Sequence, residues 1–325
     1  MHSKLFEVRV EQIRVLTPRV REYLLTSTDG AALPLATAGA HIAVHLMSPE
    51  RGWLVRHYSL IGGHGMQDDP PHRYRIAVQH EAHGVGSSLI HDSFAVGTAL
   101  WVGPPVNSFA LDHHASTVLL LAAGIGVTPL LSMTRSLLRR KRRFRMVYSG
   151  RSLDQMAYAH ILKEMCGDAL ELHTRQTDGR LDFASVLAQQ DTDTQAYVCG
   201  PSSFIDAAKQ AVQALRWAPE RLRSEAFVTA VRPGDTAFEV ALKRSNRVVQ
   251  VRADQSLLDA LSHARVPVLW DCRKGECGLC AAKVLSSEGG LFHRDRYLSE
   301  EEKKQGHLMC LCVSRTSGQS LVLDL

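Results

Sequence analysis

The chain contains the stretch Cys272-Arg-Lys-Gly-Glu-Cys277-Gly-Leu-Cys280, and Cys310-Leu-Cys312 follows about thirty residues later. The first three cysteines have the spacing C-x4-C-x2-C, which is typical of plant-type [2Fe–2S] ferredoxins with a distant fourth cysteine. Thiolates that share one small cluster must converge, so the chain has to wrap tightly, and Gly275 and Gly278 give the backbone that freedom. The stretch therefore predicts an iron–sulfur domain at the C-terminal end.

A zinc site is the competing interpretation, because four thiolates also suit tetrahedral Zn²⁺. Structural zinc sites usually use two separated C-x2-C pairs, whereas only one such pair occurs here. The spacing therefore favours iron and sulfur. A zinc-stabilised binding protein without flavin stays as the alternative.

Length and composition are those of an ordinary globular protein with two or three domains: 325 residues, 45% hydrophobic and 22% charged. The longest apolar run, Val118 to Val127, is too short to cross a bilayer, and the N-terminus lacks the layout of a signal peptide. Seven cysteines are an odd number, and a cluster would need four of them as thiolates, which favours a reducing compartment. We therefore expect a cytoplasmic monomer that binds no membrane.

A basic run, Arg139-Arg140-Lys141-Arg142-Arg143, accounts for much of the net charge of +5. It follows Thr128-Pro129, where threonine is expected as the N-cap of a helix and proline as its first residue. The run then lies at the C-terminus of that helix, where cations complement the helix dipole. An anion or nucleic-acid patch is the alternative, but no nucleic-acid-binding motif accompanies the run, so we expect no nucleic-acid partner.

Three regions separate by pattern. Residues 1–112 alternate apolar and polar in short runs such as His41-Ile-Ala-Val-His-Leu, which predicts an antiparallel β-barrel. Residues 113–228 contain continuous apolar runs such as Thr117-Val-Leu-Leu-Leu-Ala-Ala between helical patterns, which predicts an α/β domain with a parallel sheet. A polar linker leads to residues 237–325, where short strands, one short helix and the cysteine stretch predict an α+β ferredoxin domain of the β-grasp type.

Two segments of the first region suggest a site for an aromatic phosphate ester. Arg56-His57-Tyr58-Ser59 offers a guanidinium for phosphate, an aromatic face and a hydroxyl for a ring heteroatom. Gly84-Val85-Gly86-Ser87-Ser88 opens a predicted helix, whose free N–H groups can bind an anion. The alternative for the first segment is that its four residues occur together by chance. The alternative for the second is a simple glycine turn with a serine cap.

Two segments of the second region suggest a dinucleotide site. Gly124-Ile-Gly126-Val-Thr128-Pro129 joins a buried strand to a helix, where glycine lets a pyrophosphate approach the backbone closely. Cys199-Gly200-Pro201 follows a later strand of the same sheet, at the carboxyl edge where ligands bind. The alternative for the first segment is a tight turn between strand and helix. The alternative for the second is a cysteine that only fills the core.

In this order, the motifs resemble the phthalate dioxygenase reductase group of the ferredoxin–NADP⁺ reductase superfamily, together with the reductases of vanillate demethylase and carnitine monooxygenase. The resemblance covers essentially the whole chain. Besides the segments above, it includes His293-Arg294-Asp295 ahead of Leu311-Cys312-Val-Ser-Arg315.

The resemblance implies an FMN site in the barrel, held by Arg56, His57, Tyr58 and Ser59, with Gly84, Gly86, Ser87 and Ser88 at the phosphate and Phe227 stacked near the flavin. The family often has arginine where this chain has Val85. We therefore expect one phosphate contact to be missing.

The resemblance also implies a pyridine nucleotide site formed by Gly124, Gly126, Thr128, Pro129, Cys199, Gly200 and Pro201. Ser59, Thr128 and Cys199 would have the catalytic role of holding the reacting rings. NADH is favoured, although Arg151 could bind the 2′-phosphate of NADPH. The implied cluster ligands are Cys272, Cys277, Cys280 and Cys312, and Cys312 is chosen over Cys310 because it precedes a small residue and Ser-Arg.

The implied function is electron transfer. NADH gives a hydride to FMN, and the cluster passes single electrons to a Rieske-type terminal oxygenase that acts on aromatic or related compounds. A C-terminal ferredoxin domain fits this partner, because many reductases of di-iron monooxygenases carry that domain at the N-terminus. A haem monooxygenase as the partner is the alternative.

Overall fold

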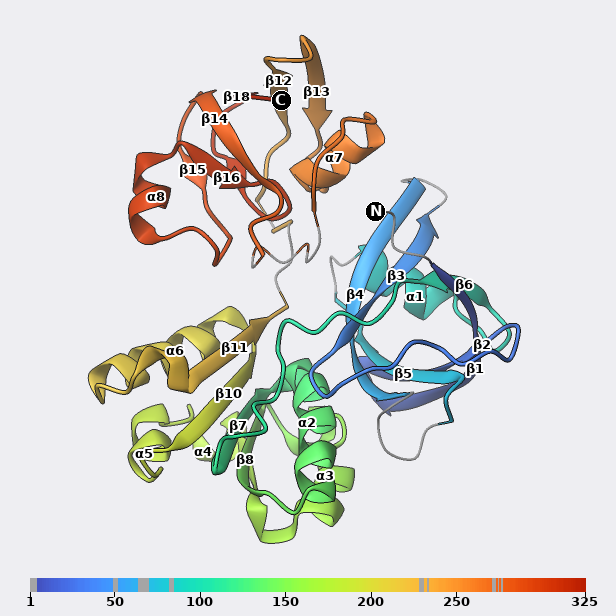
Figure 1. Cartoon of the computed structure of the whole chain (residues 1–325), viewed down its shortest axis with the longest axis vertical. Helices are drawn as coiled ribbons and strands as arrows, with labels where there is room; N and C mark the ends of the chain where they lie inside the picture. Colours follow the sequence, from blue (N-terminus) through green and yellow to red (C-terminus); the bar gives the residue numbers. More distant parts are fainter. Residues whose placement is uncertain are drawn as a thin grey trace. The chain divides into compact units, whose positions relative to one another are not determined.

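The computed structural model describes residues 5–325 apart from 49–51, 64–69, 82–84, 228–230, 233, 271, 272, 274 and 276. The chain divides into two compact units, residues 1–226 and 227–325 (Figure 1). Each unit is described by itself. In the described part of the chain, every helix is too short or too polar to cross a membrane.

The first unit begins with a closed antiparallel barrel of six strands in the order β1-β2-β5-β4-β3-β6. Alternate side chains of these strands point inward, and residues such as Val8, Val10, Ile42 and Val44 form the barrel core. The elements are β1 (Phe6–Thr17), β2 (Val20–Ser27), β3 (His41–Ser48), β4 (Gly52–Gly63), β5 (Arg73–Gln79), α1 (Val85–Ser93) and β6 (Ala99–Val102).

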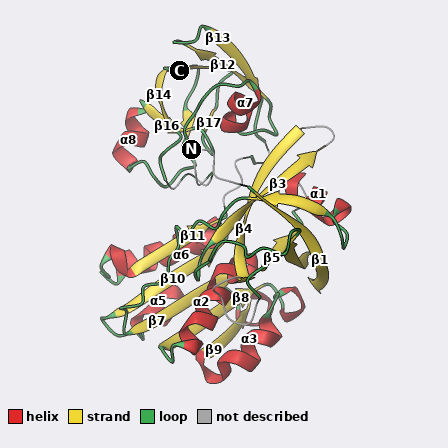
Figure 2. Ribbon diagram, turned by 45° about the vertical axis from the view of Figure 1, so that its right-hand side comes forward, coloured by secondary structure: helices red, strands yellow, loops and turns green. Residues whose placement is uncertain are grey.

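A parallel sheet of five strands in the order β11-β10-β7-β8-β9 completes the first unit. Figures 1 and 2 show helices on both faces of the sheet, with α5 and α6 on one side and α2 and α3 on the other. The strands are β7 (Thr117–Ala123), β8 (Arg143–Gly150), β9 (Leu170–Thr174), β10 (Thr194–Gly200) and β11 (Leu222–Ala226). The α-helices are α2 (Val127–Arg139), α3 (Ala159–Cys166), α4 (Arg175–Asp178), α5 (Phe183–Ala188) and α6 (Ser202–Ala214), and the 3₁₀ turns are η1 (Gly124–Gly126), η2 (Leu153–Gln155), η3 (Gly167–Ala169) and η4 (Pro219–Arg221).

The barrel and the parallel sheet share one apolar core, in which Val20 and Ile61 of the barrel pack with residues of α2 and β7. Polar contacts reinforce this packing. Tyr158 donates its hydroxyl proton to Glu22 on β2 at 2.8 Å, and Arg135 on α2 donates to the carbonyl oxygen of Ile61 at 2.5 Å. The carboxyl edge of the parallel sheet is therefore held in place against the barrel.

The second unit contains a mixed sheet in the order β13-β12-β18-β14-β16, with β12 and β18 parallel. Its core joins strand residues such as Val240 and Leu321 to Leu257, Leu258 and Leu261 of α7. The elements are β12 (Phe238–Leu242), β13 (Arg247–Val251), α7 (Leu257–His263), β14 (Ala281–Ser287), β15 (Leu291–Phe292), α8 (Glu300–Gln305), β16 (Leu308–Cys310), β17 (Arg315–Thr316) and β18 (Ser320–Leu323).

The three predicted architectures are confirmed, namely barrel, parallel α/β sheet and α+β ferredoxin domain, whereas the predicted boundaries 1–112, 113–228 and 237–325 stay predictions. One local detail was wrong. The helix α2 begins at Val127 with Gly126 as its N-cap, so Thr128 and Pro129 are its second and third residues. Thr128 donates its hydroxyl proton to the carbonyl oxygen of Ile125 in the preceding 3₁₀ turn, so it does not act as the N-cap. The basic run lies, as expected, at the end of α2.

Candidate functional site

The predicted flavin residues lie on β4, which pairs with β3 so that Tyr58 is opposite Ile42 and Ser59 opposite His41. Because side chains alternate along a strand, Arg56 and Tyr58 point to the same face. Burial raises the pKa of the Tyr58 phenol above its ordinary value, so the ring presents a neutral hydroxyl. This face of β4 combines a cation with an aromatic ring, as a bound aromatic phosphate would need.

Arg56 and the start of α1 lie against each other. A Cβ atom added to Gly86 would come 2.7 Å from Cγ and 2.9 Å from Nε of Arg56, so any larger residue here would force the Arg56 side chain to move. The guanidinium also donates to the carbonyl oxygen of Val55 at 2.8 Å. A fixed guanidinium beside a helix N-terminus fits a phosphate group.

The two serines that follow Gly86 have partners near the same helix end. The hydroxyl oxygen of Ser87 accepts the backbone N–H of Glu81 at 3.1 Å, and Ser88 contacts the Nε2 atom of His80 at 3.3 Å. Gly84 and the side chain of Val85 lie outside the described part of the chain. Their predicted roles at the phosphate stay predictions.

The hydroxyl of Ser59 is an orphaned polar group. The residue is 4% exposed, and its Oγ atom has no hydrogen-bond partner in the described part of the chain. A buried hydroxyl without a partner costs on the order of 1–3 kcal/mol. A flavin ring nitrogen or oxygen would satisfy it, so this residue fits the group that the sequence predicts.

The two predicted nucleotide segments meet at the carboxyl edges of β7 and β10. A Cβ atom added to Gly126 would lie 2.3 Å from the carbonyl oxygen of Cys199 and 2.6 Å from the backbone nitrogen of Gly200. Gly200 in turn approaches Ala123, since an added Cβ atom would lie 2.8 Å from that methyl group. Pro201 follows as the N-cap of α6. These contacts bring two helix starts together at the sheet edge where dinucleotides bind.

One residue of this edge was missed by the sequence interpretation. Glu225 on β11 is the register partner of Cys199, and both residues are fully buried. An acidic residue directly before Ala226 and Phe227, within Ser224-Glu225-Ala226-Phe227, was the signal that could have identified it. Phe227 is 37% exposed and belongs to the second unit, so its contact with flavin stays a prediction.

Two glycines of the cysteine loop have positive φ angles of 74° and lie against the rest of the second unit. A Cβ atom added to Gly275 would lie 2.7 Å from Val313 and 2.8 Å from the Cα atom of Asp295, and one added to Gly278 would lie 2.2 Å from the ring of Tyr297. The loop can wrap this tightly only because both residues lack a side chain.

The structure brings Cys280, Cys310 and Cys312 together. Hydrogen bonds from the side chains of Cys310 and Cys312 hold the pKa of the Cys280 thiol at about 3. Such a thiol is a thiolate at neutral pH, which is the form that binds metal. Cys310 ends β16, whereas Cys312 lies in the following turn, so the two cysteines are not on one strand.

The choice of fourth ligand stays a prediction, because both Cys310 and Cys312 lie beside Cys280. Cys277 is partly buried, and Cys272 lies outside the described residues. Among the described residues alone, no three His, Cys, Asp or Glu side chains form a metal-binding group. Cys280 and Cys312 are buried and lie beside each other, and as thiolate donors they fit an iron–sulfur cluster.

Comparison with protein families finds two matches. Residues 240–316 match the family described as a 2Fe-2S iron-sulfur cluster binding domain. Residues 101–222 match the N-terminal domain of dimethylamine monooxygenase subunit DmmA-like proteins. The first match covers the cysteine loop together with Cys310 and Cys312.

Curated relatives match over nearly the whole chain. The beta subunit of a heme-dependent oxidative N-demethylase from Ectopseudomonas mendocina is 39% identical over 99% of this chain and 100% of its own length. The vanillate O-demethylase oxidoreductase of a Pseudomonas species is 34% identical over 99% of this chain and 100% of its own length.

Among solved structures, phthalate dioxygenase reductase matches with a TM-score of 0.84 and 31% identity over 99% of this chain and 98% of its own. That protein is described as a modular structure for electron transfer from pyridine nucleotides to [2Fe-2S].

Proposed function

This chain belongs to the phthalate dioxygenase reductase family of oxygenase reductase subunits, and on that premise we propose that it transfers electrons from NADH through FMN and a [2Fe–2S] cluster to a Rieske-type terminal oxygenase. It is an oxidoreductase and the reductase component of an oxygenase system. The observation that carries the assignment is that three pairs of motifs come together although the members of each pair are distant in sequence. The pairs are represented by Arg56 with Gly86, Gly126 with Cys199, and Cys280 with Cys312.

FMN fits the barrel through Arg56, which binds the phosphate together with the N-terminus of α1, and through the orphaned Ser59 hydroxyl, which holds the ring. When bound, FMN supplies the conversion of a two-electron donor into single-electron steps. Tyr58 contributes an aromatic surface and the exclusion of water. The side chains bind and orient, and no proton has to leave a protein group.

The nucleotide segments place NADH by backbone geometry. The close approach of Gly126 to Cys199 and Gly200 brings two helix starts together, and their backbone N–H groups would bind the pyrophosphate. Thr128 and the buried Cys199 then position the nicotinamide and keep water away from it. Arg151 is exposed after β8, and the choice of NADH over NADPH rests on the family resemblance.

In the second unit, Cys272, Cys277, Cys280 and Cys312 hold the cluster. The depressed pKa of Cys280 keeps one ligand ready as thiolate. Tyr297 covers Gly278, and Val313 covers Gly275, so the loop is shielded on these sides by the chain itself. A reducing cytoplasm suits four thiolates, and we place the protein there as a monomer.

The Rieske-type partner and an aromatic or related substrate rest on the family and on the C-terminal position of the ferredoxin domain. A haem-dependent partner is a second candidate. It is favoured by the relative from Ectopseudomonas mendocina, which is named as the beta subunit of a heme-dependent oxidative N-demethylase.

The experiment for the reductase chemistry is absorption spectroscopy of the freshly purified protein. We expect flavin and cluster bands between roughly 400 and 550 nm that bleach when NADH is added without oxygen. A colourless protein that contains zinc would contradict the proposal. To separate the partners, NADH consumption is compared with a purified Rieske oxygenase and a purified haem-dependent N-demethylase, and acceleration by the haem enzyme alone would favour the second candidate.

A further inference from the structure

Residues 227–237 lead from the end of the first unit to β12 and are called the joining segment here. The side chain of Asp235, near the end of this segment, is buried beside two arginines of the second unit. It is only 7% exposed. Arg294 forms a two-pronged ion pair with it, in which Nη1 lies 2.8 Å from Oδ2 and Nη2 contacts Oδ1. The Nε atom of Arg315 lies 3.5 Å from Oδ2. One carboxylate therefore bridges two guanidinium groups.

Arg315 is also held by other parts of the unit. It is the largest fully buried side chain, at 1% exposure. It donates to the carbonyl oxygens of Gln255 at 2.5 Å and Thr236 at 2.9 Å, and its guanidinium lies 4.9 Å from the centre of the Phe238 ring. Arg315 therefore anchors the residue after Asp235 as well.

The backbone just before Asp235 folds onto the same carboxylate. The N–H of Arg232 donates to Oδ2 of Asp235 at 2.9 Å, and the N–H of Asp235 donates to the carbonyl oxygen of Arg232 at 3.1 Å. We call Asp235, Arg294 and Arg315 the linker clamp. It fixes the chain from Arg232 onward to the second unit.

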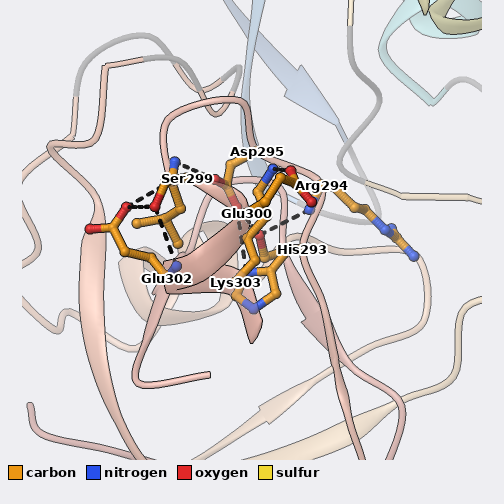
Figure 3. Close-up of polar contacts among 9 residues, drawn as sticks. His293, Arg294, Asp295, Ser299, Glu300, Glu302 and Lys303 are labelled. Carbon is orange, nitrogen blue, oxygen red and sulfur yellow. Dashed lines mark hydrogen bonds and ion pairs between the residues drawn. The ribbon is translucent and has the colours of Figure 1, made fainter. Parts of the chain in front are cut away.

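The linker clamp connects to the cluster loop through neighbouring residues, of which Arg294 and Asp295 are drawn in Figure 3. The backbone N–H of Arg294 donates to Oγ of Ser314 at 3.3 Å, and Ser314 donates to Oδ1 of Asp295 at 3.1 Å. Asp295 lies against Gly275, and the N–H of Arg296 donates to the carbonyl oxygen of Gly275 at 2.8 Å. Ser314 is two residues from Cys312. The joining segment is thus tied to both stretches that carry cluster cysteines.

The charges make Asp235 the decisive member of the clamp. Burial alone would raise the pKa of its carboxyl, but the hydrogen bond from Arg294, the N–H of Arg232 and the charges of Arg294 and Arg315 lower it below the ordinary value. Asp235 is therefore ionised at neutral pH. Without it, two buried guanidinium groups would face each other unbalanced, which is strongly unfavourable.

We propose that Asp235 is a positioning residue for electron transfer from flavin to cluster, because it makes residues 232–236 part of the iron–sulfur unit and shortens the tether between the units. The inference rests on the proposed function. The step moves one electron from the reduced flavin to the oxidised cluster, and NADH is the source. Releasing Asp235 frees the chain only back to Arg232, because Thr236 stays hydrogen-bonded to Arg315, so the tether gains four residues, 232–235.

The expected size of the effect follows from polymer statistics. The effective concentration of one tethered group near another falls roughly as the −3/2 power of tether length. A tether that grows from about five to about nine residues therefore lowers the encounter of cluster and flavin by about twofold.

The test uses the full-length protein with its cofactors and the variants Asp235→Asn and Asp235→Ala. Asp324→Asn is the matched control, because Asp324 forms a two-pronged ion pair with Arg244 in the same unit, with both contacts at 2.8 Å, away from the joining segment. In anaerobic rapid mixing with NADH, we expect flavin reduction and iron content to be unchanged in all variants. Cluster reduction should slow by about twofold in the Asp235 variants alone.

A second readout needs no electron transfer. Amide hydrogen exchange in residues 234–237 should be at least about tenfold faster in Asp235→Ala than in the wild type or Asp324→Asn, because the clamp closes this segment. Unchanged exchange, unchanged cluster reduction or loss of iron in the Asp235 variants would each overturn the inference. If NADH does not reduce the cluster of the wild type at all, the proposed function fails instead.

Discussion

The side chain of Arg56 lies directly over Gly86, so that a methyl group at position 86 would come 2.7 Å from the Arg56 Cγ atom. The two residues are thirty positions apart in sequence and come from β4 and α1. Their contact turns a strand cation and a helix N-terminus into one anion site. The proposed position of the FMN phosphate depends on it.

Replacing Gly86 with alanine should therefore displace Arg56 and weaken FMN binding. The loss of one charge-assisted hydrogen bond corresponds to about tenfold in affinity or more. Fluorescence titration of the deflavinated protein with FMN measures this. Gly103→Ala is a suitable control, because an added Cβ atom there would only make ordinary van der Waals contact with Ala43, at 3.4 Å from its methyl group and 3.9 Å from its carbonyl oxygen. Equal FMN affinity in the Gly86 variant and the wild type would show that the phosphate binds elsewhere.

Val85 leads to a related expectation from sequence. If relatives use an arginine at this position, Val85→Arg should tighten FMN binding and raise the FMN content after dialysis. Full occupancy in the wild type, unaltered by the substitution, would speak against a weakened phosphate site.

Tyr158 and Glu22 link the two halves of the first unit, and their contact should depend on pH. Burial, and then the charge and hydrogen bond of Glu22, raise the pKa of the Tyr158 phenol well above 10. A raised pKa stabilises the folded state below pH 10, and this contribution is lost as the pH rises above 10, because only the unfolded tyrosine then ionises. Tyr158→Phe should cost about 2 kcal/mol in the free energy of unfolding at pH 8.

The difference between the wild type and Tyr158→Phe should shrink as the pH rises from 10 to 11, because the variant lacks the ionising group. Denaturant unfolding at several pH values measures both quantities. A difference that stays constant over this range would mean that the phenol titrates alike in both states.

The cluster ligands allow a direct comparison of two cysteines. Cys312→Ser should abolish cluster assembly, while Cys310→Ser should leave iron and sulfide content largely intact, because Cys312 carries the family context Val-Ser-Arg. Both thiols are buried and lie beside Cys280, so the two substitutions are made at equally buried positions. Loss of iron from the Cys310 variant alone would reverse the assignment.

A fragment that ends near residue 230 separates the flavin from the cluster. Because residues 1–226 form a compact unit, we expect the fragment to keep FMN and to reduce ferricyanide with NADH. It should reduce cytochrome c poorly, since the single-electron outlet is absent. Cytochrome c reduction at the rate of the full chain would show that the flavin bypasses the cluster.

Local patterns in the sequence were sufficient for the fold class. The apolar run from Thr117 could only be a strand covered on both faces, and the cysteine spacing specified the last domain. The start of α2 was predicted too late, because Thr128 and Pro129 look like capping residues. In the structure Gly126 ends the 3₁₀ turn instead and lies against Cys199. That contact joins segments more than seventy residues apart, and spacing along one sequence cannot reveal it.

The candidate site also combines features that the sequence predicts with contacts that only the fold shows. Arg56, Ser59 and Gly86 were predicted by residue type, but only the fold shows that Gly86 lies beneath Arg56 and that the Ser59 hydroxyl has no partner among the described residues. Glu225 was missed because its burial beside Cys199 depends on strand order. The linker clamp was also beyond sequence reasoning, since Asp235 and Arg294 are brought together by tertiary packing.

The central claim is that electrons from NADH reach the cluster through the flavin. The most direct test is electron paramagnetic resonance of the purified full-length protein, frozen after anaerobic mixing with NADH. We predict a reduced [2Fe–2S] signal that accounts for the bound iron and is lost when FMN is removed and restored when FMN is added back. Flavin bleaching without a cluster signal, or a signal of equal size without FMN, would contradict the account.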